Sequence, residues 1–247
     1  MKSGSFDGIA NKFDRNIYGT TKGQMRHQLL CFYLSDLLNG APMTVLDAGA
    51  GTGMMAQAFA QQGHHLHLVD VSEEALSIAR ERLNGHPHTQ FTLGGIDSIS
   101  GKYDLVVCHA VLEWLEHPLQ ALDALLAHVK VDGQMSVSFF NQQAMLFNNA
   151  IYGNFDYIEK GMKVRNVVRL NPHNPQSPAS VLEHLAKRDD ISIELSAGIR
   201  CFHDYMRDPS MQSNRFDELL ALEKQYGAQT PYKWLGKYFY IRVRKLN

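Results

Sequence analysis

The sequence predicts an α/β fold: a mostly parallel sheet of seven strands with an antiparallel edge strand and helices on both faces. Three observations predict it. Short β-rich runs alternate with helical patterns between residues 43 and 140, which is typical of a parallel sheet. A glycine-rich loop joins the first predicted strand to the helix that follows it. Two further strands, separated by a helical segment, close the chain and indicate an antiparallel hairpin at one edge.

Each element follows from a local signal. The predicted strands are short apolar runs, and they span 44–47, 65–71, 90–93, 103–108, 134–140, 191–198 and 238–244. The predicted helices carry apolar residues at helical spacing or capping residues, and they span 24–38, 54–62, 73–84, 118–129, 180–187 and 216–226. Gly63 is placed to end the second helix, Ser72 to cap the third, and Gly133 to form a turn before the fifth strand.

These elements predict a single domain over residues 1–247, in four parts. Residues 1–40 form an N-terminal helical cover, and residues 43–140 form the half that binds a cofactor. The segments 141–180 and 203–234 are insertions that we expect to form the substrate side. The first insertion is too long for an ordinary connection, which indicates a functional or partly helical segment.

The charge of the chain is near neutral in total but uneven along its length. It carries 24 Lys+Arg against 25 Asp+Glu, a formal net charge of −1, which argues against a protein that coats nucleic acid unspecifically. Three stretches nevertheless lack acids, and their Lys+Arg counts are 3 in 15–35, 4 in 160–182 and 6 in 224–247. We expect all three to lie at the carboxyl edge of the sheet, where a basic rim would attract an RNA backbone.

The composition also excludes several classes of protein. An apolar fraction of 45% and a charged fraction of 20% exclude collagen-like and wholly disordered chains. The start of the sequence has no apolar run of signal-peptide length, and nothing is long enough to span a membrane, so we expect a cytoplasmic protein. Cys31, Cys108 and Cys201 lie far apart with no C-x-x-C pair, so we expect no metal site.

The strongest functional signal is the loop Asp47-Ala48-Gly49-Ala50-Gly51-Thr52-Gly53. Glycines allow positive φ and a close approach of the backbone to a ligand. Asp70 ends the next predicted strand, where a carboxylate can accept hydrogen bonds from the two hydroxyls of a ribose. A dinucleotide loop reads G-x-G-x-x-G and holds a pyrophosphate, beside which an acid such as Asp47 is unfavourable. The pattern is instead similar to motif I of the class I S-adenosylmethionine-dependent methyltransferases, which implies a Rossmann-like fold and S-adenosylmethionine as cofactor.

Four further segments narrow the resemblance. They are NIYGTTKGQMR at 16–26, HAVLEW at 109–114, GNFDY at 153–157 and FHDYMR at 202–207. Together they resemble the tRNA 5-carboxymethoxyuridine methyltransferases, and the resemblance covers nearly the whole chain. It implies methylation of the carboxyl group of 5-carboxymethoxyuridine at the wobble position of tRNA, giving a methyl ester, with the anticodon stem-loop as partner.

The resemblance and the loop together give a set of expected site residues. The expected cofactor contacts are Arg26, Asp47, Gly49, Ala50, Gly51, Asp70 and His109, with Ile96 and Asp97 beside the adenine. A substrate carboxylate is already anionic at pH 7, so no general base is expected. The candidates for binding that carboxylate are Arg200, His203 and Tyr205, and the candidates for RNA contacts are Tyr152, Tyr157, Lys160, Lys163, Arg165 and Arg169.

Several alternatives stay open at this point. The protein could methylate a small carboxylic acid, could bind S-adenosylmethionine without catalysis, or, remotely, could be a dehydrogenase. Arg200 could form a salt bridge with Asp204 or Glu194 instead of binding substrate. Tyr152, Phe155 and Tyr157 could stack on an extruded base or form the small core of the insertion.

Overall fold

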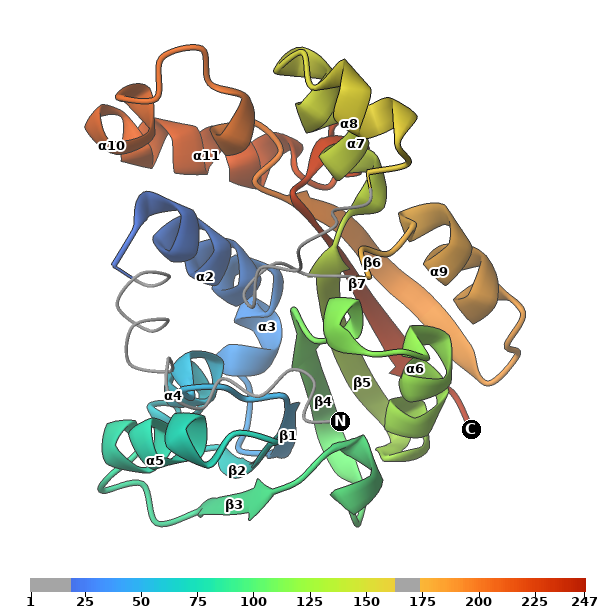
Figure 1. Ribbon diagram of the computed structural model, residues 1–247. Helices are drawn as coiled ribbons and strands as arrows, with labels where there is room; N and C mark the ends of the chain where they lie inside the picture. The colour runs from blue at the N-terminus through green and yellow to red at the C-terminus, as the bar shows by residue number, and fades with distance from the viewer. Residues whose placement is uncertain (1–18, 163–173) are drawn as a thin grey trace.

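The computed structural model describes residues 19–162 and 174–247 (Figure 1). Seven strands form one sheet in the order β3-β2-β1-β4-β5-β7-β6. Their bounds are β1 Thr44–Ala48, β2 His65–Asp70, β3 Thr89–Leu93, β4 Tyr103–His109, β5 Val129–Phe140, β6 Ile191–Ile199 and β7 Tyr238–Lys245. The strands β1 to β5 pair with one another in parallel, and β7 is antiparallel to both β5 and β6. The predicted sheet is confirmed. The last strand of the chain, β7, lies between β5 and β6, so β6 forms the edge of the sheet.

Helices cover both faces of the sheet and its carboxyl end (Figure 1). The helices before β5 are α2 Thr21–Tyr33, α3 Ser35–Leu38, α4 Met54–Ala60, α5 Glu73–Arg82 and α6 Pro118–Ala127. Those after it are α7 Gln142–Ile151, α8 Phe155–Glu159, α9 Pro178–Ala186, α10 Met211–Asn214 and α11 Phe216–Tyr226. Short 3₁₀ turns are η1 Ile96–Ser98, η2 Leu112–Trp114, η3 His203–Tyr205 and η4 Tyr232–Leu235. In Figure 1, α7, α8, α10 and α11 gather at one end of the molecule.

Strand alternation divides the core into two layers. Leu105 and Val107 of β4 face one layer with Phe59 of α4, while Val106 and Cys108 face the other. Adjacent residues of a strand point to opposite faces, so a central strand must be apolar on both sides to separate two helical layers. The near-continuous apolar run of β4 therefore follows from its central place in the sheet.

Two predicted boundaries are wrong in detail. The helix expected over 24–38 is two helices that meet at Leu34, where φ is −108° and ψ is 9°. Gly133, expected as a turn, lies inside β5, beside Asp132 with its positive φ of 63°. The register of β4 on β5 jumps there, from Tyr103 opposite Val129 to Leu105 opposite Gln134. The turn signal therefore marks an irregularity within a longer strand.

None of the described helices is long and apolar enough to cross a membrane.

Candidate active site

The glycine loop leaves β1 at the carboxyl edge of the sheet, between the ends of β2 and β4. Gly49 and Ala50 both donate their backbone N–H to the carbonyl of Val69, at 2.8 and 3.2 Å. Gly49 has φ of 75°, and a Cβ at this position would overlap the side chain of Val111. Gly51 has φ of 55°, but a Cβ there would meet no atom of the described residues within 4 Å. The loop therefore packs tightly at Gly49 and opens onto free space at Gly51, as a loop that cradles a ligand requires.

Asp70 is fixed at the end of β2 by the same loop. Its Oδ2 accepts the backbone N–H of Gly51 at 2.7 Å, and its Oδ1 accepts that of Ser72 at 2.9 Å. Each carboxylate oxygen can accept a second hydrogen bond. The Asp70 side chain is thus oriented by backbone groups at the carboxyl edge of the sheet.

Asp47 lies in β1, directly before the loop, and its carboxyl group is buried. It is 6% exposed, and its Oδ2 has no hydrogen-bond partner within the part of the chain that the structure describes. Burial, and then the negative charge of Asp70, raise the pKa of Asp47 to about 7. A cationic ligand group at this oxygen would offset both effects.

His109 ends β4 and is linked to β5 and, through it, to β7. Its Nε2 lies 2.8 Å from the hydroxyl of Ser136, which in turn donates to the hydroxyl of Tyr240 at 3.1 Å. Its Nδ1 is buried and lacks a partner among the described residues. Burial, and then the charge of Arg26, lower the pKa of His109 to about 3, so the ring is neutral at pH 7. The next residue, Ala110, adopts a positive φ of 59°, a strained conformation of the kind that occurs at ligand sites.

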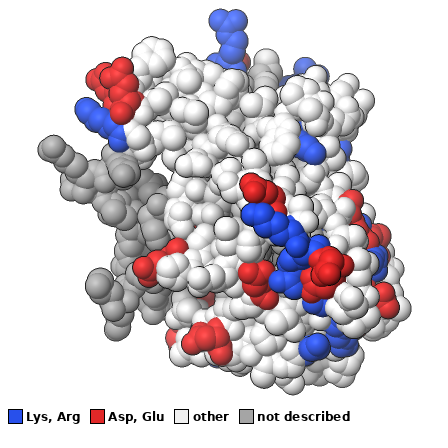
Figure 2. Space-filling model, turned by 90° about the vertical axis from the view of Figure 1, so that its right-hand side faces the viewer, with Lys and Arg blue, Asp and Glu red and all other residues white. Residues whose placement is uncertain are grey.

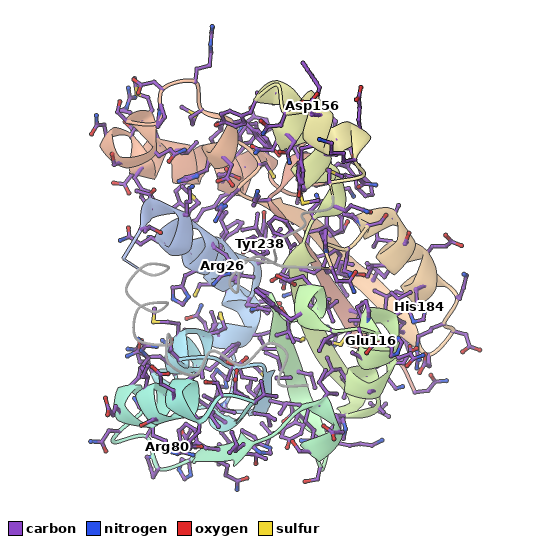
Figure 3. The ribbon with its side chains drawn as sticks, viewed as in Figure 1. Arg26, Arg80, Glu116, Asp156, His184 and Tyr238 are labelled. Carbon is purple, nitrogen blue, oxygen red and sulfur yellow. The ribbon has the colours of Figure 1, made fainter. Side chains whose placement is uncertain are left out.

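Two guanidinium groups approach the ring of Tyr238, the first residue of β7. The Cζ of Arg26, from α2, lies 5.3 Å from the ring centroid, and the Cζ of Arg200, from the turn after β6, lies 5.8 Å from it. Figure 3 shows Arg26 and Tyr238 close to one another near the centre of the molecule. Both distances fall in the range of cation–π contacts. The structure thus brings an arginine expected for the cofactor and one expected for the substrate to a single aromatic residue.

Arg200 is held by a buried ion pair. Its Nε donates to Oδ1 of Asp204 at 3.0 Å, and its Nη2 donates to Oδ2 of the same carboxylate. His203 contacts Asp204 through Nδ1 at 2.8 Å, and these bonds hold the pKa of Asp204 far below its usual range although burial opposes them. The salt bridge with Asp204, left open by the sequence, is therefore present.

Glu223 of α11 fixes the turn that carries these groups. Its carboxylate accepts the backbone N–H groups of Cys201, Phe202 and His203, at 2.7, 2.8 and 2.9 Å. It is fully buried, which is compatible with a carboxylate only when several donors satisfy it. Sequence reasoning missed Glu223, because in the sequence it is one of several acids on an amphipathic helix.

The remaining predicted residues lie in several parts of the fold. Ile96 and Asp97 are in η1, directly after β3 on the cofactor side, and Asp97 is exposed. Tyr205 donates its hydroxyl to the carbonyl of Leu235 at 2.8 Å, and its ring packs edge-on against Phe147 of α7 at 5.3 Å. The candidates Tyr152, Tyr157 and Lys160 lie in or beside α7 and α8. Lys163, Arg165 and Arg169 lie outside the described residues.

The expected basic rim is only partly correct. Of the cations in 224–247, Arg242 and Arg244 pair with Glu194, and Lys245 pairs with Asp190, in the half of β7 remote from Tyr238. Figure 2 shows Lys and Arg interspersed with Asp and Glu on one face of the molecule. Along the antiparallel strand β7, the chain runs away from the carboxyl edge, so its last cations cannot reach the crevice.

Another buried acid that sequence reasoning missed is Glu113 of η2. It is 1% exposed, and burial raises its pKa to about 7, although the backbone amides of Glu113 and Phe140 donate to it. Its Oε2 has no partner within residues 19–162 and 174–247. In the sequence, Glu113 stands out only as one residue of the motif His109–Trp114, and nothing there predicts that its carboxyl group is buried.

The fold and these residues define a class of protein. A family model described as a methyltransferase domain matches residues 22–188. Among solved structures, magnesium protoporphyrin IX methyltransferase from Synechocystis PCC 6803 with bound SAH superposes with a TM-score of 0.63 and 17% identity, covering 97% of this chain and 95% of that one. The protein is a methyltransferase, and the predicted fold, enzyme class and cofactor are confirmed.

Curated relatives identify the family. The tRNA 5-carboxymethoxyuridine methyltransferase of Escherichia coli (strain K12) is 36% identical over 99% of this chain and 97% of its own length. A malonyl-[acyl-carrier protein] O-methyltransferase of Bacillus cereus is 26% identical over 65% of this chain and 59% of its own. The chain belongs to the family of tRNA 5-carboxymethoxyuridine methyltransferases.

No group of three or more His, Cys, Asp or Glu among the described residues could hold a metal ion.

Proposed function

We propose that this enzyme transfers the methyl group of S-adenosylmethionine to the carboxylate of 5-carboxymethoxyuridine at the wobble position of tRNA, in the cytoplasm. The observation that carries the proposal is the 36% identity to a relative of that name over almost the whole chain, insertions included. Motif I alone would support only a methyltransferase. The likeness across the substrate side, residues 141–180 and 203–234, supports the same substrate.

The residues of the cofactor side fit S-adenosylmethionine, which supplies its methyl group as a sulfonium. Asp70 holds the ribose hydroxyls, while Ile96 and Asp97 lie beside the adenine. The Oδ2 of Asp47, which has no partner among the described residues, would accept a hydrogen bond from the α-ammonium group, and Arg26 would bind the α-carboxylate. Gly51, in the loop that also holds Gly49 and Ala50, gives the backbone room to approach, and the neutral His109 lies at the end of β4 with its buried Nδ1 lacking a partner among the described residues.

The residues of the substrate side act on a nucleophile that needs no activation. A carboxylate is ionised at pH 7, so the protein's tasks are to orient it, to desolvate it partly and to exclude water. Arg200, His203 and Tyr205 form the wall around this carboxylate. Because Asp204 and Leu235 hold Arg200 and Tyr205 in place, this wall is rigid before the substrate arrives.

The anticodon stem-loop binds over α7 and α8. Tyr152 is 62% exposed and Phe155 is 63% exposed, so both rings are available to stack on unpaired bases. Phe147 connects this surface to Tyr205, which lies directly after the carboxylate-binding turn. Tyr157 and Lys160, together with Lys163, Arg165 and Arg169, add aromatic and cationic contacts to the RNA.

Mass spectrometry of tRNA nucleosides tests the function. Cells that lack the protein should accumulate 5-carboxymethoxyuridine and lose its methyl ester, and the purified enzyme should restore the ester in their tRNA. Unchanged levels of the ester in such cells would refute the proposal. Transfer to small carboxylic acids but not to tRNA would favour a metabolite methyltransferase instead.

Charge reversal tests the RNA surface separately. The triple substitution of Lys163, Arg165 and Arg169 to Glu should weaken tRNA binding by a factor of about 10 or more, because phosphate contacts dominate such affinities. Cofactor affinity in the same variant should equal that of the wild type. Normal tRNA methylation by the variant would exclude an RNA-binding role for this segment.

A further inference from the structure

The ion pair of Arg200 leaves the substrate carboxylate without an obvious counter-charge. Asp204 occupies the guanidinium of Arg200 on two of its nitrogens, and both side chains are largely buried. A second carboxylate beside this pair would be repelled by Asp204 as well as attracted by Arg200. If the substrate is a carboxylate, as the proposed function holds, a further cation must stand near this turn.

Lys237 lies at the required place in the fold. Its backbone N–H donates to the carbonyl of Arg200 at 3.3 Å, and its carbonyl accepts the N–H of Asn141 at 3.1 Å. These bonds fix the residue between the ends of β5 and β6, directly before Tyr238, at the carboxyl edge of the sheet. The Nζ of Lys237 lies 4.8 Å from the centroid of the Phe140 ring.

The charge of Lys237 is poorly compensated. Within the described residues, its ammonium group makes no hydrogen bond and no ion pair. Burial lowers its pKa, the charges of Arg200 and Lys22 lower it further, and Asp204 opposes the shift. The Phe140 ring offsets part of the cost of half-burying this ammonium group, and an anion at its Nζ would offset more of it.

Other lysines of similar exposure differ from Lys237 in this respect. Lys130, at the opposite end of β5, donates to Asp104 at 2.9 Å and to Thr44 at 3.0 Å. Lys245, at the far end of β7, pairs with Asp190. Both lie away from the carboxyl edge and are satisfied by side chains of the protein. Lys237, at the carboxyl edge, makes neither kind of contact among the described residues, so its ammonium group can take one from a ligand.

We propose that Lys237 binds the carboxylate of the modified uridine and is the residue by which the enzyme distinguishes the acid from its methyl ester. During transfer, one carboxylate oxygen bonds to the methyl carbon, the carbon–sulfur bond breaks, and its electron pair stays on sulfur. The sulfonium becomes a neutral thioether and the carboxylate a neutral ester, so no proton moves. The attraction to Lys237 therefore exists before the transfer and is lost after it, which favours release of the product.

The test compares two tRNAs that differ in one methyl group. Binding of tRNA with 5-carboxymethoxyuridine and of tRNA with its methyl ester is measured in the presence of S-adenosylhomocysteine, so that no transfer occurs. The wild type should prefer the acid by a factor of about 10, the value of one charge-assisted hydrogen bond. Lys237→Met and Lys237→Gln should reduce this preference to less than about threefold, whereas Lys237→Arg should retain most of it.

A matched control and a kinetic readout make the result specific. Lys130→Met removes an ammonium group at the opposite edge of the sheet and should leave the preference unchanged. In Lys237→Met, KM for the acid tRNA should rise more than kcat falls, because the charge that Lys237 binds is partly consumed in the transition state. The thermal midpoint and the affinity for S-adenosylhomocysteine verify that each variant is folded.

The possible outcomes separate this inference from the proposed function. An undiminished preference for the acid in folded Lys237→Met or Lys237→Gln would overturn the role of Lys237, while methyl transfer by the wild type would leave the function standing. Failure of the wild type to methylate the acid tRNA would refute the function itself, and with it the role of Lys237.

Discussion

Asp47, on the glycine-loop side of the site, and Lys237, on the β7 side, are buried or partly buried groups of opposite charge whose pKa values are shifted toward the neutral form. On the side of the glycine loop, burial and then the charge of Asp70 raise the pKa of Asp47. On the side of β7, burial lowers the pKa of Lys237, and the charges of Arg200 and Lys22 add to this effect although that of Asp204 opposes it. The first arrangement suits a cationic methyl donor and the second an anionic acceptor. The protein thus holds in advance the charge pattern that the two ligands complete.

The two sides also differ in how they are built. The centre of the cofactor side, residues 47–70, comes from one continuous stretch, in which a loop and the end of the next strand share the hydrogen bonds of Asp70. The substrate side joins α2, the end of β6, α11 and the start of β7 through contacts such as that of Tyr33 with Gly198. Changes on one side should therefore leave binding on the other side intact, which the following predictions test.

The largest effect is expected for Asp70→Ala. The substitution removes the acceptor for the ribose hydroxyls and releases the amides of Gly51 and Ser72. Two lost hydrogen bonds and a less ordered loop should raise the Kd for S-adenosylmethionine by about 100-fold. Calorimetry measures this, with the exposed Glu81→Gln of α5 as control. An unchanged Kd would contradict the place of Asp70 in the cofactor site.

The corresponding change on the substrate side is Glu223→Gln. An amide cannot accept all three backbone N–H groups of residues 201–203, so the turn that presents Arg200 should shift. We expect kcat/KM for tRNA to fall by about 10-fold or more, and cofactor affinity to stay within about twofold. Glu218→Gln, on the exposed face of the same helix, is the control. A parallel loss of cofactor affinity would show that the two sides are coupled.

The pH dependence of cofactor binding sharpens the comparison. Only the ionised form of Asp47 attracts an ammonium group, and its pKa without ligand is about 7. Below that pH the carboxyl must lose a proton to bind, so the Kd should rise by up to about tenfold per pH unit between pH 7 and 5.5. In Asp47→Asn, the Kd should be higher at pH 7 and nearly independent of pH in this range. A steep dependence in the variant would assign the proton to another group.

The smallest effect is expected for Gly51→Ala, compared with Gly63→Ala. Both glycines have positive φ, at 55° and 81°, and in the part of the chain that the structure describes an added Cβ meets no atom within 4 Å at either. Each substitution should lower stability by about 1 kcal/mol, measured as a shift of roughly 2–4 °C in Tm. Gly51→Ala alone should also raise the cofactor Kd a few-fold, because its methyl group would enter the ligand's space. Equal affinities in the two variants would place the ligand elsewhere.

Sequence reasoning identified the cofactor side in detail because its signals are local. The loop, its glycines and Asp70 lie within 24 residues, and each position has its own conformational or electrostatic reason. The roles of Lys237, Tyr238 and Glu223 depend on β7 entering the sheet between β5 and β6, and no local pattern specifies that order. The salt bridge of Arg200 could be predicted only as an alternative. The sequence offered Asp204 and Glu194 as partners, and the structure shows Asp204.

The place of β7 also sets an order of assembly during synthesis. β6 leaves the ribosome before β7, yet it pairs only with β7 in the sheet. The five parallel strands can form as the chain emerges, because N-terminal segments fold first. The edge of β5 then stays open until residues 238–245 are made, and one closing event adds β7 and β6 together. A nascent chain halted before that point would expose a long apolar strand edge, and chaperones that shield such edges would act at this stage.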